Sequence, residues 1–269
     1  MDWLKPGTKA SDYKCPACGF WYQLKSKKSP IGRSIRDGAY SAMMEAIRED
    51  RAPSYFFLHY DLATWSVCNL LLVPSFAFPP SAIIKCPPLS PTAQRAGWVG
   101  CNFDLSRVPA DARIEIISTR SSGRESAPSN QSRLTSAATI IVPSSEVREK
   151  FKRVKPLKEL SVKERGWTLD VLNIVRRLVE ERGCPHPQHL CQTQRHGKVP
   201  TALDSPRAAA GDSRAPSEFT NKDIYAHARE LEHLHPDNRH IRDKIRQQLQ
   251  VLRDAGLLIH VERSLWRLP

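Results

Sequence analysis

The sequence has no long apolar run, and it is short of acidic residues and of glycine. Its longest apolar stretch, residues 70–78, is interrupted by Pro74, whereas a membrane-spanning helix needs about 20 apolar residues. The first six residues also lack the apolar segment of a secretory signal. These absences argue against a membrane protein and a secreted protein, so we expect a cytoplasmic protein with no membrane partner.

The shortage of acidic residues leaves a strong positive charge. Lys and Arg number 41 and Asp and Glu 28, which gives a net charge of +13 in 269 residues. Such an excess favours a polyanionic partner such as nucleic acid, or an anionic membrane surface. The 40% of hydrophobic residues excludes full disorder. The seven cysteines, in a reducing compartment, favour a metal or redox device over a disulfide wherever two lie close together.

The first part of the chain, residues 1–159, predicts an α/β domain. Residues 55–60 and 67–73 are continuous apolar runs, which are typical of buried strands. Residues 112–117 alternate, which is typical of a half-buried strand. Residues 37–48 have their apolar side chains on one helical face and predict a helix. Residues 118–137 are rich in Ser and Arg without a period and predict an insertion.

The second part, residues 160–269, predicts a winged helix-turn-helix domain. Three helical patterns precede two short apolar runs, which is the element order of that fold. The helices are predicted at 167–182, from Thr220 to Leu234, and from Ile241 to a C-cap at Gly256, and the strands at 257–261 and 265–268. Residues 183–217 lose all periodicity and predict a second insertion.

The densest group of chemically active residues lies near the N-terminus. In a hairpin, Asp12 would lie on one strand, and Gln23 and Lys25 would share a face of the other because strand side chains alternate. Oxygen ligands can hold a hard cation beside a phosphodiester, and a lysine can stabilise the charge that develops during hydrolysis. The alternative, an ordinary exposed hairpin with a basic edge, stays open on spacing alone.

Cysteines offer a weaker metal signal. Cys15 and Cys18 have the spacing of a zinc knuckle, but a structural zinc needs four ligands, so they form half a site. A second group of possible ligands lies in the predicted insertion and could bind metal, but chance within a biased segment is the simpler explanation. It consists of Cys184, His186, His189 and Cys191.

Two further features fit DNA. The last predicted helix and the residues before it are basic, which suits phosphate and base contacts; they include Asn238, Arg239, His240, Arg242, Lys244 and Arg246. The alternative is a solvated face, since residues 217–269 hold nine Lys or Arg against eight Asp or Glu. Trp98, between two glycines, is either an exposed ring that stacks on a base or a core residue.

Several sequence motifs together resemble the Dam-replacing family of DpnI-like methyl-directed type II restriction endonucleases. The resemblance covers most of the chain outside the two predicted insertions. The motifs are QLKSKK at 23–28, DGAY at 37–40, PLSPTA at 88–93, GWVGCNFDLS at 97–106, RGWT at 165–168 and IRQQLQVLRD at 245–254.

This resemblance implies a PD-(D/E)XK nuclease domain followed by a winged helix. It implies cleavage of double-stranded DNA at GATC sites that carry N6-methyladenine, with Mg²⁺ or Mn²⁺, by a protein that we expect to be a monomer. Asp12 and Gln23 would take the positions of the metal ligands, Lys25 that of the catalytic lysine, and Trp98 that of the tryptophan that senses the methyl group. Burying a methyl group gains roughly 1 kcal/mol, or at most about tenfold discrimination per contact.

The chain also departs from the family pattern. The family has Glu where this chain has Gln23, and a neutral amide is a weaker ligand for a hard cation than a carboxylate. The family also has an earlier Cys-x-x-Cys pair that completes the zinc site with the pair matching Cys15 and Cys18, so we expect a half-site here. These departures keep open a catalytically impaired remnant that still reads methylated DNA. A transcription regulator with a ligand-binding first domain fits the winged helix but not the resemblance.

Overall fold

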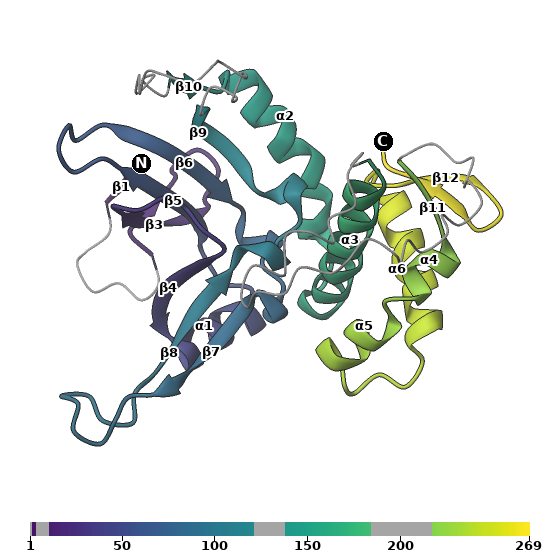
Figure 1. The fold of residues 1–269 in the computed structure, drawn as a ribbon, viewed down its shortest axis with the longest axis horizontal. Coiled ribbons are helices and arrows are strands. Elements are labelled where there is room, and N and C mark those ends of the chain that lie inside the picture. Colours follow the sequence, from purple (N-terminus) through teal and green to yellow (C-terminus); the bar gives the residue numbers. More distant parts are fainter. Residues whose placement is uncertain (1, 4–10, 121–137, 184–216) are drawn as a thin grey trace, which may run out of the picture. The chain divides into compact units, whose positions relative to one another are not determined.

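The computed structural model describes residues 2–3, 11–120, 138–183 and 217–269. Its internal contacts divide the chain into two units, residues 1–173 and 174–269 (Figure 1). The first unit is built mainly of strands and the second of helices with a small sheet. The fold class predicted from the sequence, an α/β domain followed by a winged helix-turn-helix, is confirmed.

The first unit contains a seven-stranded sheet in the order β1-β2-β3-β5-β6-β9-β10. All neighbouring strands are antiparallel except β3 and β5, which run parallel. The predicted strands at 55–60 and 67–73 are confirmed as β5 and β6, and the one at 112–117 lies slightly later, as β9. The bounds are β1 Asp2–Trp3, β2 Tyr13–Lys14, β3 Trp21–Lys27, β5 Ser54–Tyr60, β6 Val67–Val73, β9 Ile114–Arg120 and β10 Ala138–Ile141.

A second sheet of three antiparallel strands has the order β4-β8-β7. The helix α1 contacts all three strands, and Figure 1 shows it beside β7 and β8. The prediction of a helix over 37–48 is correct from residue 40 only, because residues 37–39 are the end of β4, where Ala39 pairs with Gly100 of β8. The bounds are β4 Ser34–Ala39, α1 Tyr40–Arg48, β7 Ile83–Pro88 and β8 Val99–Asp104.

Four aromatic rings join the two sheets in one core. Tyr55 and Phe57 of β5 lie against Phe103 of β8, with ring centroids 4.6 and 5.7 Å from it, and Phe78 lies 5.1 Å from the same ring. All four side chains are buried. Each such ring contributes roughly 1.5–3 kcal/mol by burial, so this cluster fixes β5 and β8 relative to each other.

The helix α3, Val162–Gly183, belongs to both units. Near its middle, Asp170 accepts a hydrogen bond from Ser81 at 2.6 Å and Asn173 donates one to the Ser106 carbonyl at 3.1 Å, which ties this half to the first unit. Its last turns carry Arg177 and Arg182, which bind residues of the second unit. The contacts therefore divide within this helix, while the domain boundary at residues 159–160 stays a prediction. A further helix, α2 at Ser144–Val154, belongs to the first unit.

The second unit is a winged helix. Its sheet has the order β11-β13-β12, and its last helix ends before Gly256, whose φ of +72° suits a glycine C-cap. The predicted single helix from Thr220 to Leu234 is two helices, although the capping box of Thr220 and Asp223 is confirmed. The bounds are β11 Glu218–Thr220, α4 Asn221–Tyr225, α5 Ala228–Leu234, α6 Ile241–Asp254, β12 Ile259–Glu262 and β13 Leu265–Arg267.

The two predicted insertions lie almost wholly outside the described residues. Of the first, residues 118–120 are described and belong to β9, and of the second, residues 183 and 217 are described. In the described part of the chain, no helix is long and apolar enough to cross a membrane.

Asp104 ties the end of β8 to the segment before β4. Its carboxylate accepts hydrogen bonds from the Arg33 guanidinium at 3.0 and 3.1 Å and from Ser106 at 2.6 Å. Burial raises the pKa of Asp104, but the hydrogen bonds from Arg33 and Ser106 outweigh it and leave the pKa below its ordinary value. The ionised carboxylate therefore stabilises the folded protein.

We expect this contribution to depend on pH. Because the folded pKa of Asp104 is lower than the unfolded one, the contribution is complete above the unfolded value, about pH 4, and is lost as the pH falls through the folded value. Urea unfolding between pH 7 and pH 3 should show a smaller acid-side loss of stability for Asp104→Asn than for the native chain. The control Glu159→Gln, at an exposed carboxylate of the same unit, should lose stability with falling pH as steeply as the native chain does. An equally steep loss in Asp104→Asn would contradict the assignment of this contribution to Asp104.

Candidate nuclease site and DNA-binding surface

The hairpin of β2 and β3 brings Asp12, Gln23 and Lys25 together. Tyr13 pairs with Tyr22, and the Asp12 amide donates to the carbonyl of the same Tyr22 at 2.9 Å. A carboxylate oxygen of Asp12 accepts the Leu24 amide at 2.8 Å. Asp12 therefore comes just before β2 rather than within it, and its carboxylate is held against the backbone of β3.

On β3, Gln23 and Lys25 lie on the same face, as predicted, and both side chains are half-buried. An aspartate carboxylate and a glutamine amide oxygen are hard oxygen donors, which suits Mg²⁺ bound by one protein carboxylate together with substrate phosphate. Among the described residues, no group of three or more His, Cys, Asp or Glu is placed to hold a metal. Asp12 and Gln23 offer two oxygen donors to a cation, whose remaining ligands would be water or phosphate.

Lys25 forms an ion pair with Asp37 of β4. The Asp37 side chain is 5% exposed and the Lys25 side chain 22%. The pair joins the two sheets, because β3 belongs to the seven-stranded sheet and β4 to the other. The predicted catalytic lysine thus has a buried carboxylate partner, Asp37, which was not predicted as a site residue.

Asp37 and Gly38 occupy a β-bulge of β4. Arg36 pairs with Asn102 and Ala39 with Gly100, so two residues of β4 lie opposite Cys101 alone. The buried Cys101 thiol donates to the Gly38 carbonyl at 3.6 Å. Burial raises the pKa of Cys101 to about 12, and the nearby negative charge of Asp37 adds to that shift, so the thiol stays protonated at neutral pH.

Cys15 and Cys18 lie in the tight turn between β2 and β3. The turn is closed by a hydrogen bond from the Gly19 amide to the Cys15 carbonyl at 2.9 Å, and Gly19 has a φ of +71°. Hydrogen bonding from the Cys18 amide lowers the pKa of Cys15, so the turn stabilises a thiolate. Both thiols are free, and a structural zinc site would need two further ligands beside them. The second predicted group, Cys184, His186, His189 and Cys191, lies outside the described residues.

Trp98 ends the loop that joins β7 to β8. The side chain is half-buried, and its ring lies so close to Gly100 that a β-carbon there would approach ring atoms to 2.7 Å. That position would also lie 3.6 Å from the Gly38 carbonyl of the bulge. Trp98 is therefore neither a core residue nor a free loop residue, because its ring packs on the backbone beside the bulge that carries Asp37.

The predicted DNA-binding residues gather at the start of α6. The Asn238 side chain accepts the His240 amide at 2.8 Å and shapes the turn before the helix. Arg239, His240 and Arg242 are exposed, and the Arg242 guanidinium lies 5.5 Å from the centroid of the Tyr225 ring. Arg239, His240 and Arg242 line a polar cavity of about 550 Å³. Tyr225 and Arg229 line the same cavity and were not predicted as DNA-binding residues.

Arg246, one turn further along α6, pairs with Asp243. Lys244 donates to Gln247 at 2.8 Å. Each of these two basic side chains therefore has an acidic or amide partner on α6. Arg239 and Arg242 are exposed at the start of the helix, where Glu232 and Asp243 line the same cavity.

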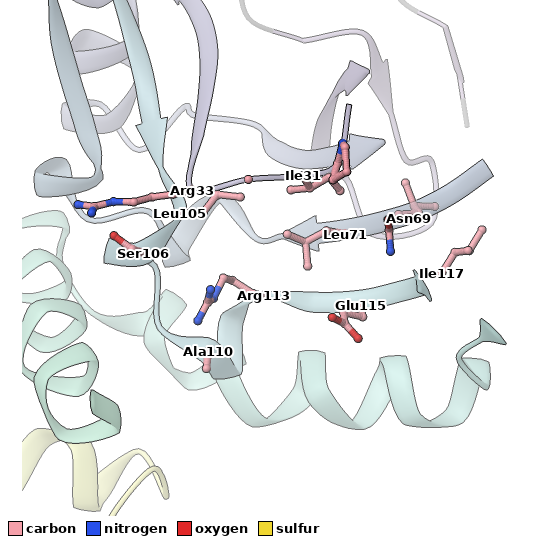
Figure 2. A pocket seen from close by; sticks show the side chains of 13 residues that line it. Ile31, Arg33, Asn69, Leu71, Leu105, Ser106, Ala110, Arg113, Glu115 and Ile117 are labelled. Atoms are coloured by element: carbon pink, nitrogen blue, oxygen red, sulfur yellow. The ribbon is translucent and has the colours of Figure 1, made fainter. Parts of the chain in front are cut away.

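A cavity of about 640 Å³ in the first unit holds none of the predicted site residues (Figure 2). It is lined by the segment before β4, parts of β6 and β9, and the turns between β8 and β9. Figure 2 labels Arg33, Arg113 and Glu115 as its charged groups, and the buried Nε of Arg113 has no hydrogen-bond partner among the described residues. The cavity is amphipathic, and nothing in it matches the chemistry of phosphodiester hydrolysis.

Comparison with known families decides the identity of the chain. Residues 1–160 match the model of the DpnI Dam-replacing family, and residues 212–267 match that of the Dam-replacing HTH domain. The chain belongs to the Dam-replacing family. The resemblance inferred from the motifs is confirmed, and membership in this family together with the HTH domain implies binding to DNA and a part in restriction-modification.

Family membership does not by itself assign the site residues. In this Dam-replacing protein the Asp12 carboxylate lies against the backbone of β3, which carries Gln23 and Lys25 on one face, and Arg239, His240 and Arg242 line one cavity at the start of α6. Their roles, the bound metals and the response to methylation stay predictions. Asp37 was missed as a site residue because the apolar residues after it predicted a helix. The Asp-Gly pair at 37–38 was the available signal, since glycine in a strand marks a bulge.

Proposed function

We propose that this chain is a metal-dependent endonuclease that cleaves double-stranded DNA at GATC sites carrying N6-methyladenine. The observation that carries the proposal is the half-buried Lys25 beside Asp12 and Gln23 on the hairpin of a protein of the Dam-replacing family. An acidic residue, an oxygen donor and a lysine in this arrangement suit hydrolysis of a phosphodiester.

In this proposal each residue has one task. Asp12 and Gln23 would hold Mg²⁺ or Mn²⁺, which when bound polarises the phosphate and lowers the pKa of a water molecule. The Lys25 ammonium donates hydrogen bonds to the phosphate oxygens, on which negative charge grows in the transition state. Arg239 and Arg242 neutralise backbone phosphates at the second unit, and Trp98 contacts the methyl group with its ring. Zinc at Cys15 and Cys18 would stiffen the turn between β2 and β3.

The second candidate is a DNA-binding protein without catalysis. The observation that favours it is Gln23, because its amide lacks the charge of the family's carboxylate. This candidate keeps the surface at the start of α6 and the ring of Trp98, and it predicts methyl-dependent binding in the absence of cleavage.

Lys25→Ala tests the catalytic assignment. The variant should cleave adenine-methylated DNA at least about 100-fold more slowly, because it loses a group that stabilises the charge of the transition state. Its dissociation constant for the same DNA, measured by gel shift in Ca²⁺, should stay within about threefold of the native value, since one phosphate contact contributes little to the total affinity. A loss of affinity as large as the loss of rate would instead make Lys25 a phosphate anchor.

Gln23→Glu separates the two candidates. If the site is complete apart from this ligand, the carboxylate should strengthen metal binding, raise the cleavage rate and lower the Mg²⁺ concentration needed for half-maximal cleavage. The control is Gln247→Glu, at an exposed glutamine of α6, which should leave the Mg²⁺ dependence unchanged. A Gln23→Glu variant that binds methylated DNA and cuts none would support the DNA-binding candidate.

Trp98→Ala should lower the ratio of affinities for methylated and unmethylated DNA by up to about tenfold, the value of one buried methyl contact. Gly100→Ala should have a similar but smaller effect, because its β-carbon displaces the ring of Trp98. Gly32→Ala is the matched control, since a β-carbon there meets no atom within 4 Å. An unchanged ratio in Trp98→Ala would exclude Trp98 as the sensor.

A further inference from the structure

We propose that Asp37 is the positioning residue of Lys25, and that the β-bulge of β4 is the device that aims its carboxylate. The inference rests on the proposed function, because it assigns to Lys25 the catalytic task described above. It adds a residue from a different sheet to the site, one that neither the hairpin nor the lysine motif contains.

The first argument is the cost of ordering a lysine. A lysine side chain has four rotatable bonds, and holding it in one conformation costs conformational entropy. A lysine that becomes ordered only when DNA arrives adds that cost to the transition state. The ion pair with Asp37 orders Lys25 beforehand, which is the preorganisation that electrostatic catalysis requires.

The second argument is the difference in exposure across the pair. The Asp37 side chain is almost fully buried at 5%, while Lys25 keeps 22% of its surface in solvent. An ammonium group has three N–H donors, and a single carboxylate partner leaves the donors that point into solvent free for another acceptor. Asp37 therefore fixes the ammonium from the protein side and leaves the solvent side for a phosphate oxygen.

The third argument is that the backbone defines where the carboxylate lies. In a regular strand, Asp37 and Gly38 would each face one residue of β8, but both lie opposite Cys101. Bulges turn a side chain out of the regular alternation and are common beside active sites. The Cys101 thiol, itself fully buried, donates to the Gly38 carbonyl and holds the bulge in place.

The competing explanation is that the pair only holds the two sheets together. A purely structural pair would affect unfolding and leave the chemical step of the folded enzyme intact. Substitution of a positioning residue instead lowers kcat while the variant stays folded and its DNA affinity is unchanged. A substitution that keeps the negative charge then restores part of kcat. The two explanations therefore differ in measurable ways.

The experiment compares the native chain with Asp37→Asn, Asp37→Glu and the control Glu159→Gln, each checked for folding by circular dichroism. The first readout is competitive labelling of amines by a limiting acetylating reagent, with Lys25 measured against the exposed Lys28 by mass spectrometry. Labelling of Lys25 relative to Lys28 should rise at least threefold in Asp37→Asn and stay near the native ratio in Asp37→Glu and Glu159→Gln.

The second readout is cleavage of an adenine-methylated duplex with Mn²⁺. For Asp37→Asn we expect kcat to fall at least tenfold, KM and the dissociation constant in Ca²⁺ to stay within twofold, and Asp37→Glu to recover part of the rate. An unchanged labelling ratio in Asp37→Asn, or an unchanged kcat, would overturn the proposal. If the native chain cuts no DNA, the proposed function fails, and the labelling ratio alone then decides whether Asp37 holds Lys25.

Discussion

The packing of Tyr55 and Phe57 against Phe78 and Phe103 is the interaction on which the candidate nuclease site depends. It locks β5 of the seven-stranded sheet to β8 of the three-stranded sheet. Strand β3 pairs with β5, and β4 pairs with β8, so the position of each follows from this core. Lys25 and Asp37 meet because their strands flank the two strands that the aromatic rings join.

The same arrangement links the proposed reading of the base to the proposed chemistry. The ring of Trp98 lies over Gly100, and Gly100 pairs with Ala39, the residue that follows the bulge of β4. A displacement of Trp98 would therefore disturb the backbone next to Asp37, which contacts Lys25. In the proposed function, recognition of the methyl group and positioning of the lysine would both depend on this short stretch of backbone.

The sequence predicted those parts of the structure that depend on local patterns. Hydrophobic periodicity over a few residues predicts the apolar runs of β5 and β6 and the face shared by Gln23 and Lys25. Helix-capping preferences predict the capping box at Thr220 and the glycine after α6. The family resemblance rested on short motifs and extends to both units.

The contacts that join distant segments could not be predicted in this way. Asp37 was assigned to a helix because its pairing with β8 depends on residues more than sixty positions later. The helix from Thr220 to Leu234 was predicted as continuous because its break at residues 226–227 carries neither glycine nor proline.

The most direct test of the account is digestion of one plasmid, prepared with and without adenine methylation at GATC, by the native chain in Mg²⁺ and in Mn²⁺. The account predicts that the methylated plasmid is cut at its GATC sites and that the unmethylated plasmid stays intact. Intact plasmid in both preparations, or equal cutting of both, from a protein shown to be folded would contradict the proposal that this chain is a methyl-directed endonuclease.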